Sequence, residues 1–397
     1  MSASRWPLGL LGAFLLSAGV EGLVARFGPA DASFIQANWA DVGKSSRAVG
    51  PDVGVLCLGD SQVKSGLQPR LMTPELGTPV ANLALVGGQA ASSALVFERA
   101  LRAGARPRAV VVGYFPGLLA ADLRINTEKW PELLSPGECL DLALTARDAR
   151  LFAPMMARAL IPSLRRRESL RAATLAEFDP SLDEPKGKPP GKGRPEARAY
   201  VRNWQVNGGA HVLADNPDFR DEAPASATEF GPHARWKPKA ENLAFTRRLL
   251  SRAEAAGVRV FWLLPATAPA LQAARERSGL HEAYLAVVKN LQREFPRLTV
   301  LDPSPLLRDP SRFSDVYHLD RSGASVLSLS VAEALRDSLS GANRQGGWLV
   351  LKEPTADPGR AASLLEDLAE SSARARPPGA ATSLAAGSGA SPDTQRR

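Results

Sequence analysis

Residues 53–62, VGVLCLGDSQ, form a short apolar run that stops abruptly at Gly59-Asp60-Ser61. An apolar run of this length is typical of a strand that is buried on both faces, as in a parallel sheet. The glycine lets the chain turn at the strand end, and Ser61 is then expected at the carboxyl edge of the sheet, where open α/β folds collect ligands and catalytic groups. A Gly-Asp-Ser turn can also simply close a strand. The function of Ser61 therefore depends on the partners that the rest of the chain supplies.

The remaining chain alternates between strand-like and helix-like patterns. Short apolar runs that end at turn residues predict further strands at residues 80–86, 108–115, 258–264 and 298–301. Helical spacing of apolar residues is present in residues 89–104, 136–173, 241–255, 270–295 (with a break at Gly279) and 323–339. This succession favours parallel strands joined by right-handed crossovers. We therefore predict an α/β fold with about five parallel strands.

The first 27 residues have the composition of a signal anchor or a signal peptide. One basic residue, Arg5, precedes an apolar stretch that continues past Glu21 to Val24. The stretch approaches the roughly 20 residues that a helix needs to cross a bilayer. No clear Ala-x-Ala cleavage site follows, which favours an uncleaved anchor. We expect a single-pass protein of the cell membrane with an extracytoplasmic body; a soluble cytoplasmic enzyme would require this segment to be an ordinary helix.

The α/β domain is expected in two parts, residues 28–175 and 239–345. The insertion between them, residues 176–238, contains a Pro-, Gly- and Lys-rich stretch that predicts a flexible segment, and it is a candidate lid over one end of the sheet. Beyond Lys352 the chain is rich in Ala, Ser, Gly and Pro, and we predict a largely disordered tail over residues 346–397.

Charge and composition narrow the class of partner. The formal net charge is +8, but the basic residues are spread over helices that also carry acids, and no nucleic-acid motif is present. We expect no nucleic-acid partner, because an anionic membrane surface or polymer explains the charge equally well. Two cysteines exclude a disulfide framework; Cys57 is expected as a buried small apolar residue, although a disulfide with Cys139 stays open.

No cofactor and no metal are expected from the remaining residues. The histidines outside the motif described next, at positions 211, 233 and 281, lack metal-ligand spacing.

The second informative stretch is residues 315–318, Asp-Val-Tyr-His, in the loop after the last predicted strand. A serine hydroxyl is a weak nucleophile unless a base removes its proton, and histidine is the usual base. A carboxylate fixes the tautomer of that histidine and stabilises its charged form. We therefore predict a catalytic set of Ser61, His318 and Asp315 at one edge of the sheet.

These motifs resemble the blocks of the GDSL-type, or SGNH, hydrolase superfamily. They are residues 58–61 (LGDS), Asn82 with Gly87 five residues later, and residues 315–318 before the last helix. The similarity covers roughly residues 53–115 and 239–339. It implies a three-layer flavodoxin-like fold in which Ser61 is the nucleophile, His318 the base and Asp315 its orienting group. It also implies an oxyanion hole made by the backbone N–H groups of Ser61 and Gly87.

One block departs from the family. Where the family usually has Gly-x-Asn-Asp after the third strand, this chain has GYFP at residues 113–116. The asparagine that completes the oxyanion hole is absent there, and Asn126 and Asn203 are the candidates to replace it. With its N-terminal span, the chain is more similar to membrane-anchored SGNH-like proteins of the bacterial envelope, several of which resemble exopolysaccharide O-acetyltransferases.

Two functions follow from the resemblance. The first is an esterase or O-acyltransferase that acts on an acyl group of an envelope glycan or lipid through an acyl-enzyme on Ser61. The second is a catalytically inactive protein of the same fold that binds or scaffolds envelope polymers, as part of an envelope protein complex. Trp204 and Trp236 are candidates for a sugar-binding surface, whereas Trp262, inside a predicted strand, is expected in the core.

Overall fold

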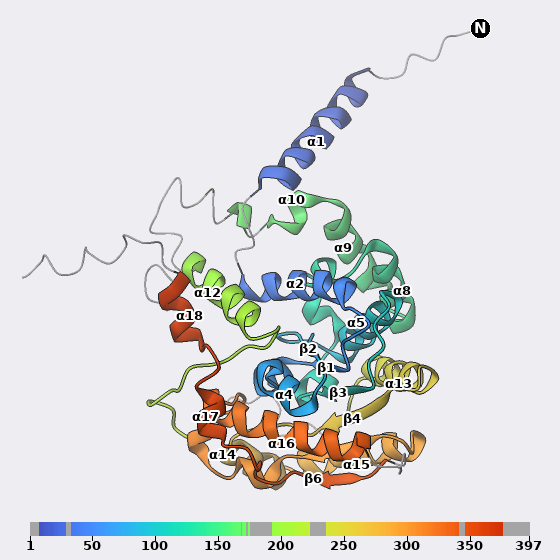
Figure 1. The fold of residues 1–397 in the computed structure, drawn as a ribbon. Helices are drawn as coiled ribbons and strands as arrows, with labels where there is room; N and C mark the ends of the chain where they lie inside the picture. Colours follow the sequence, from blue (N-terminus) through green and yellow to red (C-terminus); the bar gives the residue numbers. More distant parts are fainter. Residues whose placement is uncertain are drawn as a thin grey trace, which may run out of the picture.

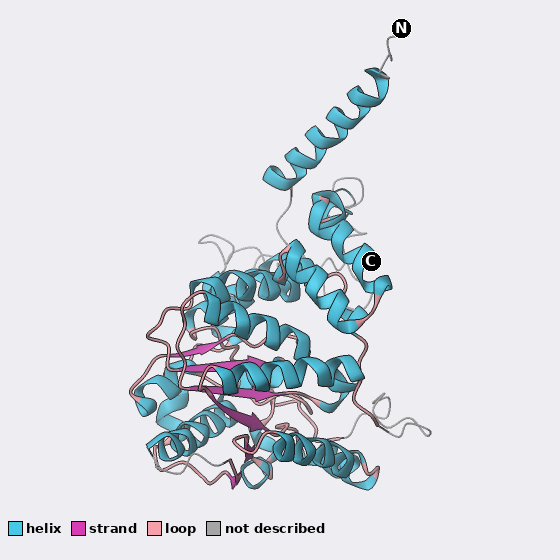
Figure 2. Cartoon of the chain, turned by 90° about the vertical axis from the view of Figure 1, so that its right-hand side faces the viewer, coloured by secondary structure: helices cyan, strands magenta, loops and turns pink. Residues whose placement is uncertain are grey.

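The computed structural model describes residues 8–28, 33–167, 169–171, 174, 193–222, 236–340 and 346–375. Helix α1 (Leu8–Phe27) projects from the body and touches it only near its C-terminal end, and the body is built around one sheet (Figure 1). Figure 2 shows the strands as a layer with helices on both sides. The predicted α/β class is therefore confirmed.

The sheet has six strands, all parallel, in the order β2-β1-β3-β4-β5-β6. The strands are β1 (Val55–Gly59), β2 (Val80–Asn82), β3 (Ala109–Gly113), β4 (Arg259–Leu263), β5 (Thr299–Asp302) and β6 (Trp348–Val350). The first five coincide with the apolar runs that predicted them, except that β5 extends one residue further to Asp302, and β6 is an addition to the predicted count of about five. Because β1 lies between β2 and β3, the chain passes from β1 to β2 on one side and then crosses back over β1 to β3 on the other side. A crevice is expected at the carboxyl ends of such strands.

Alternate residues of the strands point to opposite faces and form two hydrophobic clusters. Leu56, Leu58 and Trp262 belong to the first cluster, and Val55 and Cys57 belong to the second. The helices over the first face include α2 (Phe34–Ala48), α5 (Ala90–Arg102), α13 (Ala240–Ala255) and α15 (Leu280–Glu294). Those over the second face include α3 (Ser61–Gly66), α4 (Pro69–Leu76) and α16 (Arg321–Ser340).

Gly59 ends β1 in a conformation that only glycine adopts readily, with φ +142°. A Cβ atom here would lie 2.3 Å from the carbonyl oxygen of Gly113, its register partner on β3. The close approach of the two backbones explains why a glycine precedes Asp60 and Ser61.

The stretch predicted as helical at residues 136–173 contains several separate helices in its described part. The chain forms α8 (Pro136–Ala146), α9 (Ala149–Leu160) and α10 (Pro162–Arg165). Arg147 takes the left-handed conformation and ends α8, Asp148 caps α9, and Pro162 starts α10. Other short elements are α6 (Pro116–Ala120), η1 (Leu123–Asn126), α7 (Trp130–Leu133), α14 (Pro269–Arg277), η4 (Ser304–Leu307) and η5 (Pro310–Arg312).

The prediction of a largely disordered tail is wrong for residues 346–375. They form β6, α17 (Pro358–Ala362) and α18 (Leu368–Ala375), and α18 packs against α12 (Gly193–Val206) from the insertion. The ordering comes from long-range pairing, because Leu349 of β6 lies in register with Leu301 of β5 and Ser371 of α18 is fully buried. The rest of the predicted disordered tail lies outside the described residues, as do most of the predicted flexible stretch of the insertion and His233.

Both cysteines, Cys57 and Cys139, are buried and free, so the open alternative of a disulfide is excluded. Trp262 is fully buried in the core, as expected.

Helix α1 is long and apolar enough to cross a membrane by length and composition. The stretch that meets these criteria is Gly9–Phe27, with a mean hydropathy of 1.6, and none of its residues is fully buried by the rest of the chain.

Candidate active site

Ser61 is the first residue of α3, directly after β1, and its hydroxyl faces His318. The distance from Ser61 Oγ to His318 Nε2 is 2.9 Å. The other ring nitrogen of the histidine, Nδ1, lies 3.0 Å from Asp315 Oδ1 and 2.9 Å from Oδ2. The structure therefore brings together the three side chains that the sequence predicted as a set, over 257 residues of chain.

The turn that carries His318 is held by the carboxylate of Asp315. Oδ1 accepts hydrogen bonds from the backbone N–H groups of Tyr317 at 2.7 Å and His318 at 3.0 Å. Burial alone would raise the pKa of Asp315, but the hydrogen bonds and the nearby histidine hold this pKa below its usual value. Asp315 is therefore charged near neutral pH and keeps the Nδ1 side of the ring as a hydrogen-bond donor.

Asp60, the residue before Ser61, is buried and joins the ends of β1 and β3. Its carboxylate caps α3 by accepting from Gln62 N–H at 2.9 Å, and it accepts from Phe115 N–H at 2.6 Å. Burial raises the pKa of Asp60 to about 6, against the lowering effect of these hydrogen bonds. The sequence interpretation missed this role, although the position of Asp60 before the first turn of a helix is a capping signal.

Gln62, the residue after Ser61, ties α3 to the turn that carries the histidine. Its side-chain amide donates to the carbonyl of Tyr317 at 2.9 Å and to the carbonyl of Ala266, after β4, at 3.1 Å. Only 8% of Gln62 is exposed. No local signal in the sequence could have found this contact, because the two acceptors lie 255 and 204 residues further along the chain.

Gly87 lies in a turn that packs against the end of β1. The N–H of Leu85 donates to the carbonyl of Gly59 at 3.0 Å, and Gly87 has a φ of +70°. The carbonyl of Gly87 accepts from Asn126 Nδ2 at 3.0 Å, which fixes this peptide unit. The N–H of Ser61 is the first of α3 and has no acceptor within its own helix. The two predicted oxyanion donors therefore belong to segments that meet at the Gly59 end of β1.

Neither asparagine proposed as a replacement in the oxyanion hole has its amide directed to that role. Asn126 Nδ2 is already bonded to Gly87 O and to Gln89 Oε1, both at 3.0 Å. Asn203 Nδ2 donates to the carbonyl of Glu366 at 2.9 Å, where α12 meets the C-terminal segment. Both replacements are therefore wrong, and Asn126 supports the turn of Gly87 instead.

Two residues of the insertion contact segments that carry the predicted catalytic residues. The N–H of His211 donates to the carbonyl of Lys64 in α3 at 2.9 Å, and Asn216 Nδ2 donates to the carbonyl of Ser314, next to Asp315, at 3.0 Å. The predicted sugar-binding role is wrong for Trp204, which is only 2% exposed. Trp236 is partly buried and donates its indole N–H to the carbonyl of Pro116 at 2.9 Å.

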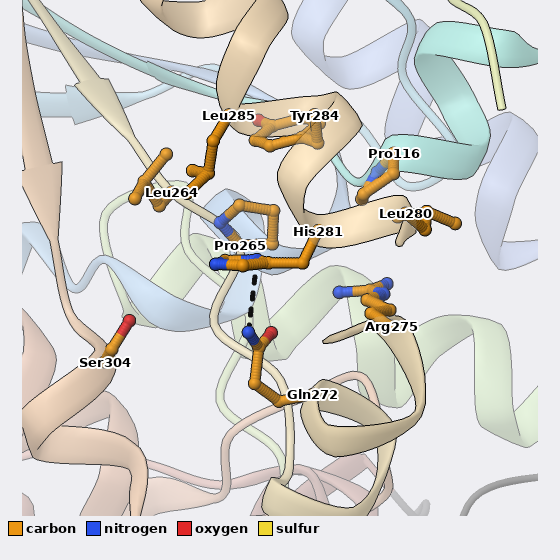
Figure 3. A pocket seen from close by; sticks show the side chains of 10 residues that line it. All are labelled: Pro116, Leu264, Pro265, Gln272, Arg275, Leu280, His281, Tyr284, Leu285 and Ser304. Atoms are coloured by element: carbon orange, nitrogen blue, oxygen red, sulfur yellow. Dashed lines mark hydrogen bonds between the residues drawn. The ribbon is translucent and has the colours of Figure 1, made fainter. Parts of the chain in front are cut away.

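A small pocket that none of the three predicted catalytic residues lines is located between the end of β4, α14 and α15 (Figure 3). His281 Nδ1 lies 3.1 Å from Gln272 Nε2 in it, and Arg275, on its wall, stacks its guanidinium 4.6 Å from the ring centre of Phe115. The volume of about 10 Å³ is room for one water and excludes a sugar or an acyl chain. Within the described residues, no group of three or more His, Cys, Asp and Glu side chains is arranged to hold a metal ion.

No protein-family model matches the chain, and no curated protein matches it in sequence.

Proposed function

We propose that the protein is a membrane-anchored serine esterase or O-acyltransferase of the SGNH type, with an extracytoplasmic body. The observation that carries the proposal is the hydrogen-bonded series Ser61 Oγ, His318 Nε2 and Asp315, with both links at 2.9 Å. A nucleophile, a base and a group that orients the base are the minimum that an acyl-enzyme mechanism needs.

The reaction that fits this series has two halves. His318 Nε2 takes the proton of Ser61 as Oγ bonds to the acyl carbon, and His318 then returns the proton to the departing alcohol as the ester bond breaks. In the second half, an acceptor hydroxyl gives its proton to His318 as its oxygen bonds to the acyl carbon. His318 then passes this proton to Ser61 Oγ as the bond between Oγ and the acyl carbon breaks, which frees Ser61. Water as acceptor makes the protein an esterase, and a sugar hydroxyl makes it an acyltransferase.

The negative charge of each tetrahedral intermediate needs donors. We assign this role to the N–H groups of Ser61 and Gly87, and losing one such donor typically costs about 10²–10³ in rate. The Asp60 carboxylate supports the arrangement by fixing the start of α3 and the backbone of Phe115.

The strand order supports the family resemblance. The order β2-β1-β3-β4-β5 is the one used by flavodoxin-like sheets, and Ser61 follows the strand from which the connections diverge. The projecting apolar helix α1 favours a substrate at a membrane, and we propose an acylated glycan or lipid of the envelope.

The test uses the full-length chain in detergent micelles with a fluorophosphonate probe, which bonds covalently to an activated serine. We expect the wild type to be labelled, and Ser61→Ala and His318→Ala to be folded but unlabelled. Labelling that persists unchanged in both variants would refute the assignment.

A second function is favoured by the GYFP sequence at residues 113–116, which lacks the family's oxyanion asparagine. On this account the protein is an inactive member of the fold that binds or scaffolds an envelope polymer. A folded wild type that resists the probe but retains polymer on a glycan array would support this function.

A further inference from the structure

The C-terminal part of α1 is not free, because α10 packs beside it (Figure 1). Ser163 of α10 donates both its N–H, at 2.8 Å, and its hydroxyl to the carboxylate of Glu21. Arg166 donates to the carbonyls of Val24 at 2.9 Å and Gly28 at 3.0 Å, at the end of α1. The Val24 carbonyl also accepts from the N–H of Gly28 at 3.0 Å. The only carboxylate of the apolar helix is therefore satisfied by the body of the protein.

These contacts fix the depth of α10 relative to the span. Glu21 lies six residues before Phe27, the last residue of α1, which corresponds to about 9 Å along the helix axis. If α1 crosses a bilayer, Ser163 beside Glu21 cannot lie in bulk water beyond the span. Helices that rest in a membrane interface bury their apolar face about 5–10 Å into the boundary between headgroups and acyl chains, which is the same depth.

The side chains around this contact suit an interface. Leu160 at the end of α9, Ile161, and Leu164 in α10 are 63%, 37% and 39% exposed, so the body leaves them uncovered. The exposed Arg167 and the Arg166 that holds α1 follow in sequence. We name Leu160, Ile161, Leu164, Arg166 and Arg167 the shoulder.

Apolar side chains next to arginines are the composition that binds the headgroup region, since the arginines are attracted to anionic lipids and the apolar groups enter the acyl boundary. Arg165, between Leu164 and Arg166, is paired with Glu132 at 2.5 Å. Because the Glu132 carboxylate pairs with Arg165, it does not neutralise Arg167. The positive charge of Arg167 can therefore attract an anionic lipid headgroup.

We infer that the shoulder sits in the headgroup region of the same bilayer that α1 spans. The inference rests on the anchoring of α1 proposed above. The body then has two attachments to the membrane, the span and the shoulder, and its orientation over the lipid surface is fixed. The active site consequently faces a constant direction relative to the membrane.

The experiment places a nitroxide spin label at single introduced cysteines in the full-length chain. The native Cys57 and Cys139 are buried, so they are protected from the label. Leu160→Cys and Leu164→Cys report on the shoulder. Val350→Cys and Leu364→Cys are matched controls, because these apolar side chains are 54% and 55% exposed on β6 and next to α17.

The labelled chains are reconstituted in vesicles of phosphatidylcholine and phosphatidylglycerol, and the relaxation of each label by oxygen and by a water-soluble nickel chelate is measured. We expect labels at 160 and 164 to be severalfold less accessible to nickel and more accessible to oxygen than labels at 350 and 364. Accessibility to nickel equal to that of the controls would overturn the inference.

Two further measurements test the anchoring itself and contact with a second copy of the chain. A label at Leu16→Cys, a residue of α1 that is 71% exposed, reports insertion of the span. Accessibility to nickel at position 16 would refute the anchoring, and the inference with it. Accessibility to nickel at positions 160 and 164 alone would refute only the placement of the shoulder in the headgroup region.

Contact with a second copy of the chain would appear as spin–spin broadening at position 164 that grows with the protein-to-lipid ratio, together with low accessibility to both reagents. This result would assign the shoulder to an interface between two copies of the chain and overturn the inference.

Discussion

Replacing Gln62 by leucine should slow the reaction of Ser61 without touching any of the three predicted catalytic side chains. The Gln62 amide holds the carbonyl of Tyr317, the residue before His318, at 2.9 Å, and the carbonyl of Ala266 at 3.1 Å. Leucine removes both donors while keeping a side chain of similar volume. The base then loses one of the contacts that fix its distance from Ser61.

The expected magnitudes follow from the burial of the two carbonyls. Ala266 is buried, so an orphaned carbonyl there costs about 1–3 kcal/mol, and the half-buried Tyr317 adds about 1 kcal/mol, for a loss of about 2–4 kcal/mol in the free energy of unfolding. A displacement of a catalytic group by about 1 Å can cost up to about 10² in rate. The histidine turn keeps other supports, such as the bond from Ala268 N–H to the Val316 carbonyl, so we expect labelling about 10- to 100-fold slower.

Gln292 provides a matched control. Its amide also bridges two backbone carbonyls, those of Leu298 at 3.1 Å and Gly347 at 3.0 Å, but near β5 and β6 and away from Ser61. Gln292→Leu should lower the denaturant midpoint and leave the rate of fluorophosphonate labelling per folded molecule unchanged. The reasoning is refuted if Gln62→Leu is labelled at the wild-type rate, or if Gln292→Leu slows labelling to the same extent.

Three further predictions concern single residues of the site. Gly87→Ala should lose about 1–2 kcal/mol in the free energy of unfolding because φ is +70°, and Gly257→Ala, with the same φ and equally open space, should lose the same. Only Gly87→Ala should slow labelling, because relief of the strain turns the backbone N–H that we assign to the oxyanion; equal labelling rates in the two variants would contradict this assignment. Asp315→Asn should slow labelling by about 10² or more, because a neutral amide stabilises the charged histidine poorly, and a wild-type rate would remove Asp315 from the mechanism. Burial raises the pKa of Asp60 to about 6, so the folded state binds the proton more tightly than the unfolded state. The free energy of unfolding of the wild type, relative to that of Asp60→Asn, should therefore fall by up to about 3 kcal/mol as the pH rises from about 4 to about 6. Denaturation curves in which this difference grows with pH would contradict the raised pKa.

Local sequence patterns were enough to predict most of the architecture and the grouping of Ser61, His318 and Asp315. The buried runs of β1, β3 and β4 are continuous apolar stretches with a glycine, proline or polar turn at their ends, and such stretches identify themselves without tertiary information. Ser61 and His318 were predicted together because each stands in a short motif that follows a parallel strand, and parallel strands share one carboxyl edge.

The features that could not be predicted from the sequence depend on contacts between segments that are distant along the chain. The three residues of β6 carry no periodicity of their own, and they become a strand only through pairing with β5. Trp204 was expected on a sugar-binding surface, but it is buried on α12, the helix against which α18 packs. The role of Gln62 is invisible for the same reason, since its acceptors are set by the folds of two remote loops.

Trapping the acyl-enzyme intermediate shows directly whether Ser61 carries the acyl group. The full-length protein is mixed with an activated acetyl ester, quenched in acid within the first turnover, digested, and analysed by mass spectrometry. We expect an acetyl group on Ser61 of the wild type, and none at this position in His318→Ala. An unmodified Ser61 in the folded wild type, or equal acetylation of Ser61 in His318→Ala, would contradict the proposed role of Ser61.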